Sequence, residues 1–158
     1  MQAALEREEA AAAGQRTALN LQGIKKEEIR RGDVLAYPGS LVRSILADVK
    51  LSVFQTSGRE LKSGDRVHFN YGSAQAIAKA VLLDAERIGP GESAYAQLRF
   101  DEPIVLKRDD RFIIRFLSPV ETFGGGIVLD AAPVRHKRGE SQALEALKVK
   151  ERGTEPEV

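Results

Sequence analysis

The chain has 158 residues, of which 30% are charged and 42% hydrophobic, with a formal net charge of +1 and no cysteine. This length suits one ordinary domain, and the near-neutral charge excludes a chain that binds nucleic acid through its overall electrostatic field. The lack of cysteine excludes disulfides and thiolate metal sites, and with no apolar run of membrane-spanning length and no signal-peptide pattern we expect a cytoplasmic protein with no membrane partner.

The first forty residues predict one short helix and two strands. Residues 1–13 are rich in Ala and Glu, which favours helix, although so short a helix is marginal in water. Apolar residues alternate over Thr17–Leu21 and recur at Val34–Ala36, after the turn signal Gly32-Asp33, and both segments are predicted as strands. Pro38-Gly39-Ser40 marks a boundary in the chain.

The middle of the chain predicts short strands separated by turns. In the first of them, Val49 and Leu51 share one face and Asp48 lies on the other. The same alternation or a continuous apolar run recurs at residues 66–71, 76–84, 94–100 and 104–106. Strands of this length and spacing favour an all-β sandwich or a closed barrel.

The segment from Arg111 to Asp130 carries the most specific pattern. Phe112, Ile114 and Phe116 alternate with other residues as in a strand that has one apolar face. The three glycines at 124–126 then lie inside a second β-rich stretch, where glycine weakens a strand. A bulge, a sharp barrel corner or the close approach of another backbone would require them.

The C-terminal tail differs from the rest of the chain. From Gly139 onward, Ala143, Leu144 and Leu147 have helical spacing, and the end from Gly153 has the composition of a disordered segment. We therefore expect a short helical or disordered tail.

Candidate catalytic chemistry is sparse. His68 and His136 are far apart in the sequence, and neither has a partner at a spacing typical of metal ligands or of a nucleophile and its base. His68 is interpreted as a solvent-facing strand residue and His136 as part of a basic string. No G-x-x-x-x-G-K-[ST] loop occurs, and the glycines at 124–126 lack the lysine and helix that a phosphate-binding loop needs. We expect no catalytic residue, metal site or cofactor site.

Two stretches of the sequence resemble the elongation factor Tu superfamily of translational GTPases. GIKKEEIRRGDVLA, residues 23–36, is similar to the G-I-x-x-x-x-I-x-R-G-x-V-L-A end of that family's second domain. DRFIIR at 110–115 and TFGGGIV at 122–128 are similar to the R-F-x-x-R and T-x-G-x-G-x-V strands of its third domain. The continuation to Asp130, Pro133 and the basic residues at 135–138 is most similar to bacterial selenocysteine-specific elongation factors.

The resemblance implies a fold and a division of the chain. Residues 40–138 would form the family's third domain, a closed antiparallel Greek-key β-barrel. Residues 1–38 would be the remnant of a second β-barrel, and residues 139–158 a linker toward winged-helix domains. The chain would thus be a fragment, and its severed strands would favour swapping or dimerisation through their free edges.

The resemblance also implies a function. This part would be a non-catalytic module of a GTP-dependent factor that delivers selenocysteinyl-tRNA to the ribosome. It would bind the acceptor and T arms of the tRNA and dock on its own GTPase domain, which would hold GTP and Mg²⁺ outside this chain. The positions that match the family's tRNA contacts are Arg66, Asn70, Ser73, Arg115 and Ser118. One position departs from the family, because Glu102 stands where a basic residue commonly precedes the proline.

Alternatives remain open for several of these features. The basic string Arg135, His136, Lys137 and Arg138 is either a solvated linker or an RNA-phosphate contact. The glycines at 124–126 serve either packing between barrel strands or the close approach of a partner. For the whole chain, the alternatives are an autonomous β-barrel that binds another protein, the equivalent domain of another elongation factor Tu-like factor and, as the weakest, an enzyme.

Overall fold

The structure is a computed structural model that describes residues 10–137 and 139–152. Its chain divides into two compact units, Met1–Arg30 and Arg31–Val158. In the first unit the described residues form one short 3-10 helix, η1 (Lys26–Glu28). At its N-terminus the Lys25 backbone amide donates a hydrogen bond to the Glu28 carboxylate. The helix predicted at residues 1–13 lies mostly outside the described residues.

The two N-terminal strands predicted from the sequence are wrong. No described residue before Arg43 is in a strand, and the apolar side chains of that region, such as Leu19, Leu21 and Leu35, are exposed. A strand is stabilised by a neighbouring strand, and alternation alone supplies no neighbour. The interpretation of residues 1–38 as a second-barrel remnant stays a prediction.

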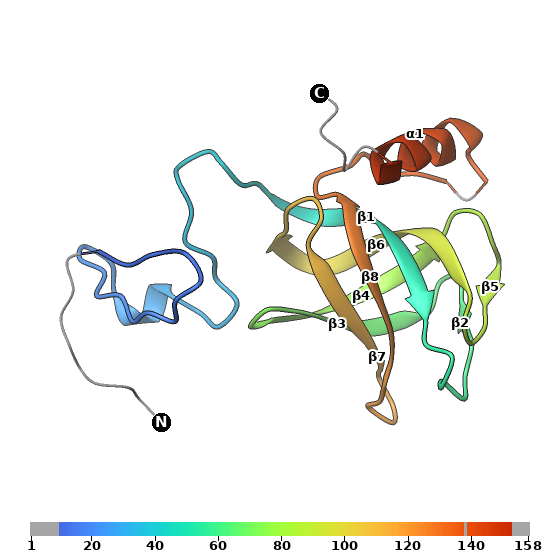
Figure 1. The fold of residues 1–158 in the computed structure, drawn as a ribbon, viewed down its shortest axis with the longest axis horizontal. Helices are drawn as coiled ribbons and strands as arrows, with labels where there is room; N and C mark the ends of the chain where they lie inside the picture. The colour runs from blue at the N-terminus through green and yellow to red at the C-terminus, as the bar shows by residue number, and fades with distance from the viewer. Residues whose placement is uncertain (1–9, 138, 153–158) are drawn as a thin grey trace. The chain divides into compact units, whose positions relative to one another are not determined.

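The second unit is built around a closed antiparallel barrel of six strands (Figure 1). These strands are β1 (Arg43–Val53), β3 (Arg66–Tyr71), β4 (Ala74–Leu82), β6 (Ser93–Val105), β7 (Arg111–Phe116) and β8 (Thr122–Asp130). Their order around the barrel is β1-β6-β4-β3-β7-β8, and β8 closes on β1. A three-strand meander, β3-β4-β6, with β1 beside β6 makes the Greek key, so the predicted fold class is confirmed.

Two further strands form a small sheet beside the barrel. β2 (Leu61–Lys62) pairs with β5 (Arg87–Ile88), and both lie in the connections between barrel strands. Because the barrel is closed, these two-residue strands are the only described ones that leave an edge. The predicted dimerisation through severed edges stays a prediction.

Inward-facing residues of all six strands fill the barrel. Phe69 lies at the centre, with its ring centroid 5.0 Å from that of Phe100 and 4.8 Å from that of Phe112. Aromatic rings at these separations contribute stability beyond the area that they bury. Alternation along each strand therefore predicted the inner faces correctly, with Val49, Leu51 and Ile114 fully buried.

The three glycines of β8 let the barrel close tightly. A Cβ on Gly125 would lie 2.5 Å from the carbonyl oxygen of Phe112 on β7, where real Cβ contacts essentially never fall below 3.0 Å. A Cβ on Gly124 or Gly126 would lie closer still to carbonyl oxygens of β1. The packing account of the glycines thus follows from β8 being pressed between β1 and β7.

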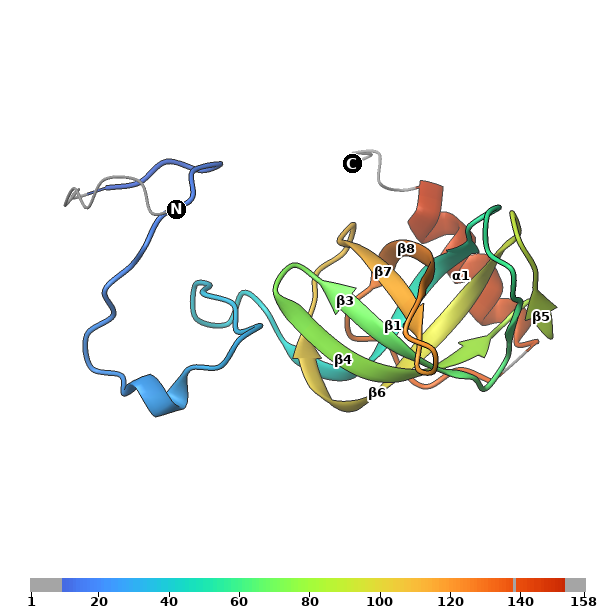
Figure 2. The ribbon, with the colours of Figure 1, turned by 90° about the horizontal axis from the view of Figure 1, so that it is seen from below.

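A C-terminal helix adds a second layer outside the barrel. Helix α1 (Ser141–Arg152) lies against β8 (Figure 1 and Figure 2), and its Leu147 is buried in a cluster with Leu83, Tyr95 and Leu129. The Lys150 ammonium binds the Asp130 carboxylate at 2.5 Å. The helical spacing predicted for this tail is confirmed over 141–152, and the residues from 153 onward lie outside the described part.

Candidate RNA interface

Three of the five residues that the resemblance selected share one outer face of the barrel. Arg66 and Asn70 point outward from β3, opposite the buried Val67 and Phe69. Arg115 points outward from β7 and is the cross-strand partner of His68, which lies between Arg66 and Asn70 on β3. The structure therefore brings Arg66, Asn70 and Arg115 together.

Ser73 and Ser118 lie at opposite ends of this face. Ser73 is exposed in the tight turn between β3 and β4, next to the Asn70 end of the strand. Ser118 follows the end of β7 that pairs with Val67. Its carbonyl oxygen accepts a hydrogen bond of 3.5 Å from the guanidinium of Arg59, which also stacks over the Phe116 ring. The two serines therefore lie too far apart along β3 to form one binding site together.

Four nitrogen atoms on the outer surface of β3, β6 and β7 are buried and lack a hydrogen-bond partner among the described residues. They are His68 Nδ1, Asn70 Nδ2, Arg99 Nε and Arg115 Nε. A buried donor left unpaired costs free energy. Because the chain itself covers these atoms, an external ligand would meet the exposed side chains around them.

Basic side chains extend the same face across three strands. Arg66 on β3 pairs in register with Lys79 on β4, and Lys79 pairs with Arg99 on β6. One carboxylate opposes this row, since the Arg66 guanidinium forms an ion pair with Asp101 and both side chains are about half exposed (49% and 47%). Lys79 and Arg99 were not selected from the sequence, because only the strand register shows that they continue the row.

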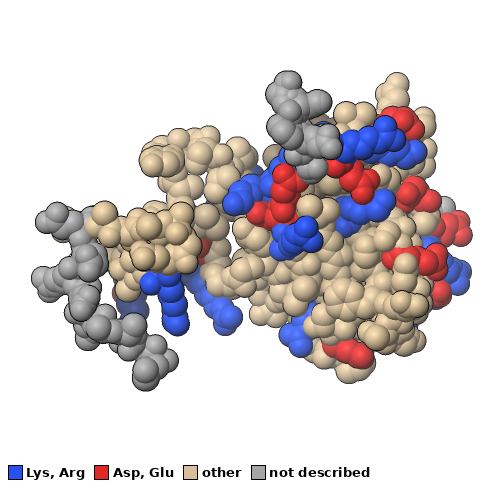
Figure 3. Space-filling view, in the orientation of Figure 1, with Lys and Arg blue, Asp and Glu red and all other residues tan. Residues whose placement is uncertain are grey.

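Charges of both signs are scattered over the barrel. In the view of Figure 3, Lys and Arg as well as Asp and Glu occur on it, separated by uncharged surface, and the chain's net charge is only +1. Contacts to a polyanion would therefore be local, made by individual side chains.

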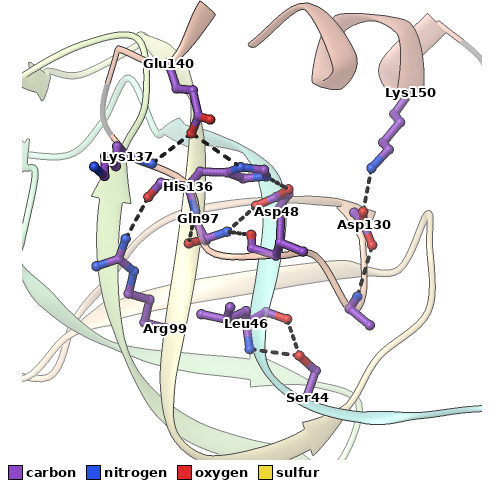
Figure 4. A network of polar contacts seen from close by, with 12 residues as sticks. Ser44, Leu46, Asp48, Gln97, Arg99, Asp130, His136, Lys137, Glu140 and Lys150 are labelled. Atoms are coloured by element: carbon purple, nitrogen blue, oxygen red, sulfur yellow. Dashed lines mark hydrogen bonds and ion pairs between the residues drawn. The ribbon is translucent and has the colours of Figure 1, made fainter. Parts of the chain in front are cut away.

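Within the predicted basic string, His136 is held against the barrel. We call residues 131–137, Gly139 and Glu140 the strap. His136 Nε2 lies 2.8 Å from Asp48 Oδ2, and the His136 side chain is only 14% exposed (Figure 4). The Glu140 carboxylate accepts a hydrogen bond from the Lys137 amide. A buried carboxylate thus holds His136, and the choice between a solvated linker and an RNA contact for the string stays a prediction.

Gln97 fastens the strap to β6. Its amide nitrogen donates to Asp48 Oδ1 at 3.0 Å and to the Val134 carbonyl at 2.8 Å, and its amide oxygen accepts from the His136 backbone N–H at 3.1 Å. Figure 4 shows Asp48, Gln97 and His136 pointing toward one another. Every polar group of the Gln97 amide therefore has a partner, which explains how a fully buried glutamine is tolerated.

The pKa values of Asp48 and Arg99, which both lie beside the strap, differ from the usual values of these groups. Burial raises the pKa of the Asp48 carboxyl above its usual value, and hydrogen bonds from Gln97 and the nearby His136 oppose that rise. Burial, and then the charge of Arg135, lower the pKa of the Arg99 guanidinium. Asp48 is thus a paired structural carboxylate, whereas Arg99 is a cation held near a like charge.

Of the remaining members of the string, Arg135 and Lys137 are exposed, and Arg138 lies outside the described residues. Arg135 lies between Val134 and His136, the two residues whose backbone groups Gln97 binds. The strap therefore presents Arg135 at a fixed place beside β6.

The described residues provide neither a metal site nor a nucleotide cradle. No cluster of three or more His, Asp or Glu side chains capable of holding a metal occurs among them. The backbone of Gly124–Gly126 is engaged in the ladders with β1 and β7, so its amides do not form a phosphate-binding loop. No helix in the described part is long and apolar enough to cross a membrane.

Comparison with known proteins agrees with this geometry. Residues 48–135 match the family described as "Selenocysteine-specific elongation factor, beta-barrel domain". The chain is 40% identical over 140 residues to the selenocysteine-specific elongation factor of Desulfomicrobium baculatum, which covers 88% of this chain and 22% of that protein. The chain thus spans about a fifth of the length of that relative. The matched family is the β-barrel domain, and this chain belongs to the selenocysteine-specific elongation factor family.

Proposed function

We propose that this chain is a non-catalytic module that binds the backbone of the acceptor and T arms of selenocysteinyl-tRNA. In a whole protein of this family it would act beside a GTPase domain, which would hold GTP and Mg²⁺, during delivery of that tRNA to the ribosome. The observation that carries the proposal is the row of basic side chains Arg66, Lys79 and Arg99, which lie in register on the adjacent strands β3, β4 and β6.

The chemistry of this row fits an RNA backbone. Phosphate and 2′-hydroxyl oxygens are hydrogen-bond acceptors spaced along a helix, and basic side chains on the adjacent strands β3, β4 and β6 match such a surface better than a single small ligand. Contacts of this kind fix orientation and carry no sequence information. The module would therefore hold many tRNAs alike, and selection of selenocysteinyl-tRNA would fall to other parts of the protein.

A second surface supports docking to a protein domain. At the barrel end where β7 and β8 connect, Phe54, Leu117 and Val120 are exposed. At the same end, the Phe116 ring of β7 stacks on the Phe123 ring of β8, with their centroids 3.7 Å apart. The Phe54 amide donates to the Phe123 carbonyl, which joins the two loops. An apolar patch at a loop end suits a domain interface, so we place the docking of the GTPase domain there.

A filter-binding titration of the full chain tests the RNA proposal. We expect salt-dependent binding to selenocysteinyl-tRNA and to an ordinary elongator tRNA with similar affinity, because phosphate contacts dominate. Isolated affinity should be weak, since one domain supplies few contacts. Absence of salt-dependent binding to either tRNA at micromolar protein would count against the RNA module and favour the protein-binding alternative.

A further inference from the structure

Arg99 and Arg135 form a pair of like charges beside the strap. Arg99 projects outward from β6, and Arg135 lies in the strap where this segment passes β6. The Arg99 Nη2 donates at 2.9 Å to the carbonyl oxygen of His136, the residue next to Arg135. Burial, and then the charge of Arg135, lower the pKa of Arg99. Two guanidinium groups at one junction of barrel and strap would favour an anion between them.

We propose that Arg99 and Arg135 together bind one phosphodiester group of an RNA backbone. This inference rests on the proposed RNA-binding function and adds to it a contact point at the junction of barrel and strap. The ligand chemistry is a phosphate monoanion with two free oxygens, which matches the planar donors of guanidinium groups.

The Arg99 side chain is oriented for such a contact. Its Nη2 donates to the His136 carbonyl at 2.9 Å, which fixes the plane of the guanidinium. Its Nε is buried and has no hydrogen-bond partner among the described residues. A phosphate would therefore contact the Nη side of the guanidinium, since the chain covers Nε.

The carboxylates of this region are already engaged. Asp48 contacts Gln97 and His136, and Asp101 pairs with Arg66. Glu140 accepts a hydrogen bond from the Lys137 amide. Among the described residues, no ion pair of either arginine of the proposed site with a carboxylate occurs, so the pair is available to an external anion.

The strap positions Arg135 through its backbone. Gln97 accepts from the His136 N–H and donates to the Val134 carbonyl, so the peptide groups on both sides of Arg135 are fixed to β6. Arg99 is anchored to the same strap residue, His136. Both cations therefore share one support, and the row of Arg66, Lys79 and Arg99 continues onto Arg135.

The test is a titration of a fluorescein-labelled RNA hairpin with the full chain at several salt concentrations. We expect Arg99→Ala and Arg135→Ala each to weaken binding by about tenfold and to reduce the salt slope by about one. Because both arginines bind the same phosphate, the double variant should lose little more than the worse single variant. Arg87→Ala, which removes an exposed arginine from the small sheet, is the charge-matched control and should bind nearly as the unmodified chain does.

Other outcomes separate the possible failures. If both variants bind like Arg87→Ala while Arg66→Ala weakens binding, the phosphate site is wrong and the proposed function stands. If the unmodified chain shows no salt-dependent RNA binding, both are wrong. Inorganic phosphate that competes with the hairpin better than chloride at equal ionic strength would identify a general phosphate site. Should Arg99→Ala fail to fold, Arg99→Lys and the exposed Arg135→Ala decide the question. If both of these variants bind RNA as tightly as the unmodified chain, the proposal is contradicted.

Discussion

At the scale of single residues, the glycines of β8 show how the absence of a Cβ allows neighbouring barrel strands to pack closely. A Cβ on Gly126 would meet the backbone carbonyl of Lys50 and the ring of Phe112. Backbone atoms of β1 cannot move aside without opening the ladder between β1 and β8. The sequence indicated that these glycines were required, but only the register shows which carbonyl groups they face.

Replacing Gly126 by alanine should therefore destabilise the barrel. We expect Gly126→Ala to lower the free energy of unfolding by about 2 kcal/mol or more, because a methyl group is forced against fixed backbone. Gly58→Ala is the matched control, since a Cβ there has nothing within 4 Å. Urea unfolding of both variants measures the difference, and equal stability would show that β8 can shift outward.

The hydroxyl of Tyr95 gives a prediction about pH. Burial, followed by the hydrogen bond that it donates to Glu151, raises the pKa of Tyr95 to about 12. Between its usual value of 10.0 and about 12, the folded chain keeps a proton that the unfolded chain has lost, so stability falls as pH rises through this window.

Tyr95→Phe should remove that part of the pH dependence. We expect the loss of stability from about pH 9 to about pH 11 to be smaller in this variant than in the unmodified chain, measured by urea unfolding at both values. Tyr37→Phe is the control, because Tyr37 is 87% exposed. Equal slopes in all three proteins would contradict the assignment.

At the scale of elements, helix α1 and the strap explain what alternation could not predict. Alternation placed Asp48 opposite the apolar face of β1, and this is correct. Yet Asp48 and Gln97 are fully buried, because the strap covers the outer surface of β1 and β6. Periodicity reports which face of a strand a residue occupies. Whether that face is buried depends here on the strap, whose His136 is 39 residues from Gln97 and 88 from Asp48 in the sequence.

The proline in β6 shows a related limit. A separate strand was expected at residues 104–106, but β6 continues from Ser93 through Pro103 to Val105. The register between β1 and β6 shifts from Ser44 opposite Ile104 to Leu46 opposite Arg99, so an irregularity in the ladder accommodates the proline. Proline is tolerated at such bulges, and its presence alone does not end a strand.

Helix α1 should depend on one buried leucine. Leu147→Ala removes the side chain that packs against Leu83, Tyr95 and Leu129, and we expect its loss to cost about 2–3 kcal/mol of helix docking. Hydrogen exchange should then speed up in α1 while the barrel amides keep their protection. Val149→Ala, at a position 65% exposed, should leave the exchange of α1 nearly unchanged. Simultaneous loss of protection in the barrel would show that α1 and the barrel unfold as one unit.

At the scale of the whole molecule, the fold could be predicted and the interface only in part. The barrel followed from strand spacing and from the resemblance, and Arg66, Asn70 and Arg115 do share a face. Arg99 and Lys79 were missed because strand register, which brings residues of different strands into one row, is set by the three-dimensional ladder. The N-terminal strands were wrong because the pairing that would stabilise them is not encoded in their own alternation.

The RNA face gives a prediction for the complete chain. Arg66→Ala should lower tRNA affinity by about three- to tenfold and equally for different tRNAs, since the contact is to phosphate. Its exposed ion pair with Asp101 contributes little to stability, so the melting temperature should change by no more than about 1–2 °C. Arg87→Ala, which breaks a comparable exposed pair with Glu60, serves as the control. A large fall in melting temperature for Arg66→Ala alone would make Arg66 structural.

The path of the strap has a mechanical consequence. After β8, the chain passes Asp48 on β1 and Gln97 on β6, and the Gly139 amide then binds the Leu83 carbonyl just beyond β4. Helix α1 leads back to β8 through Lys150 and Asp130. A force applied at the C-terminal end would first detach helix α1 and then break these contacts of the strap, one after another. The hydrogen bonds between β8 and β1 would be stretched only after those contacts had broken.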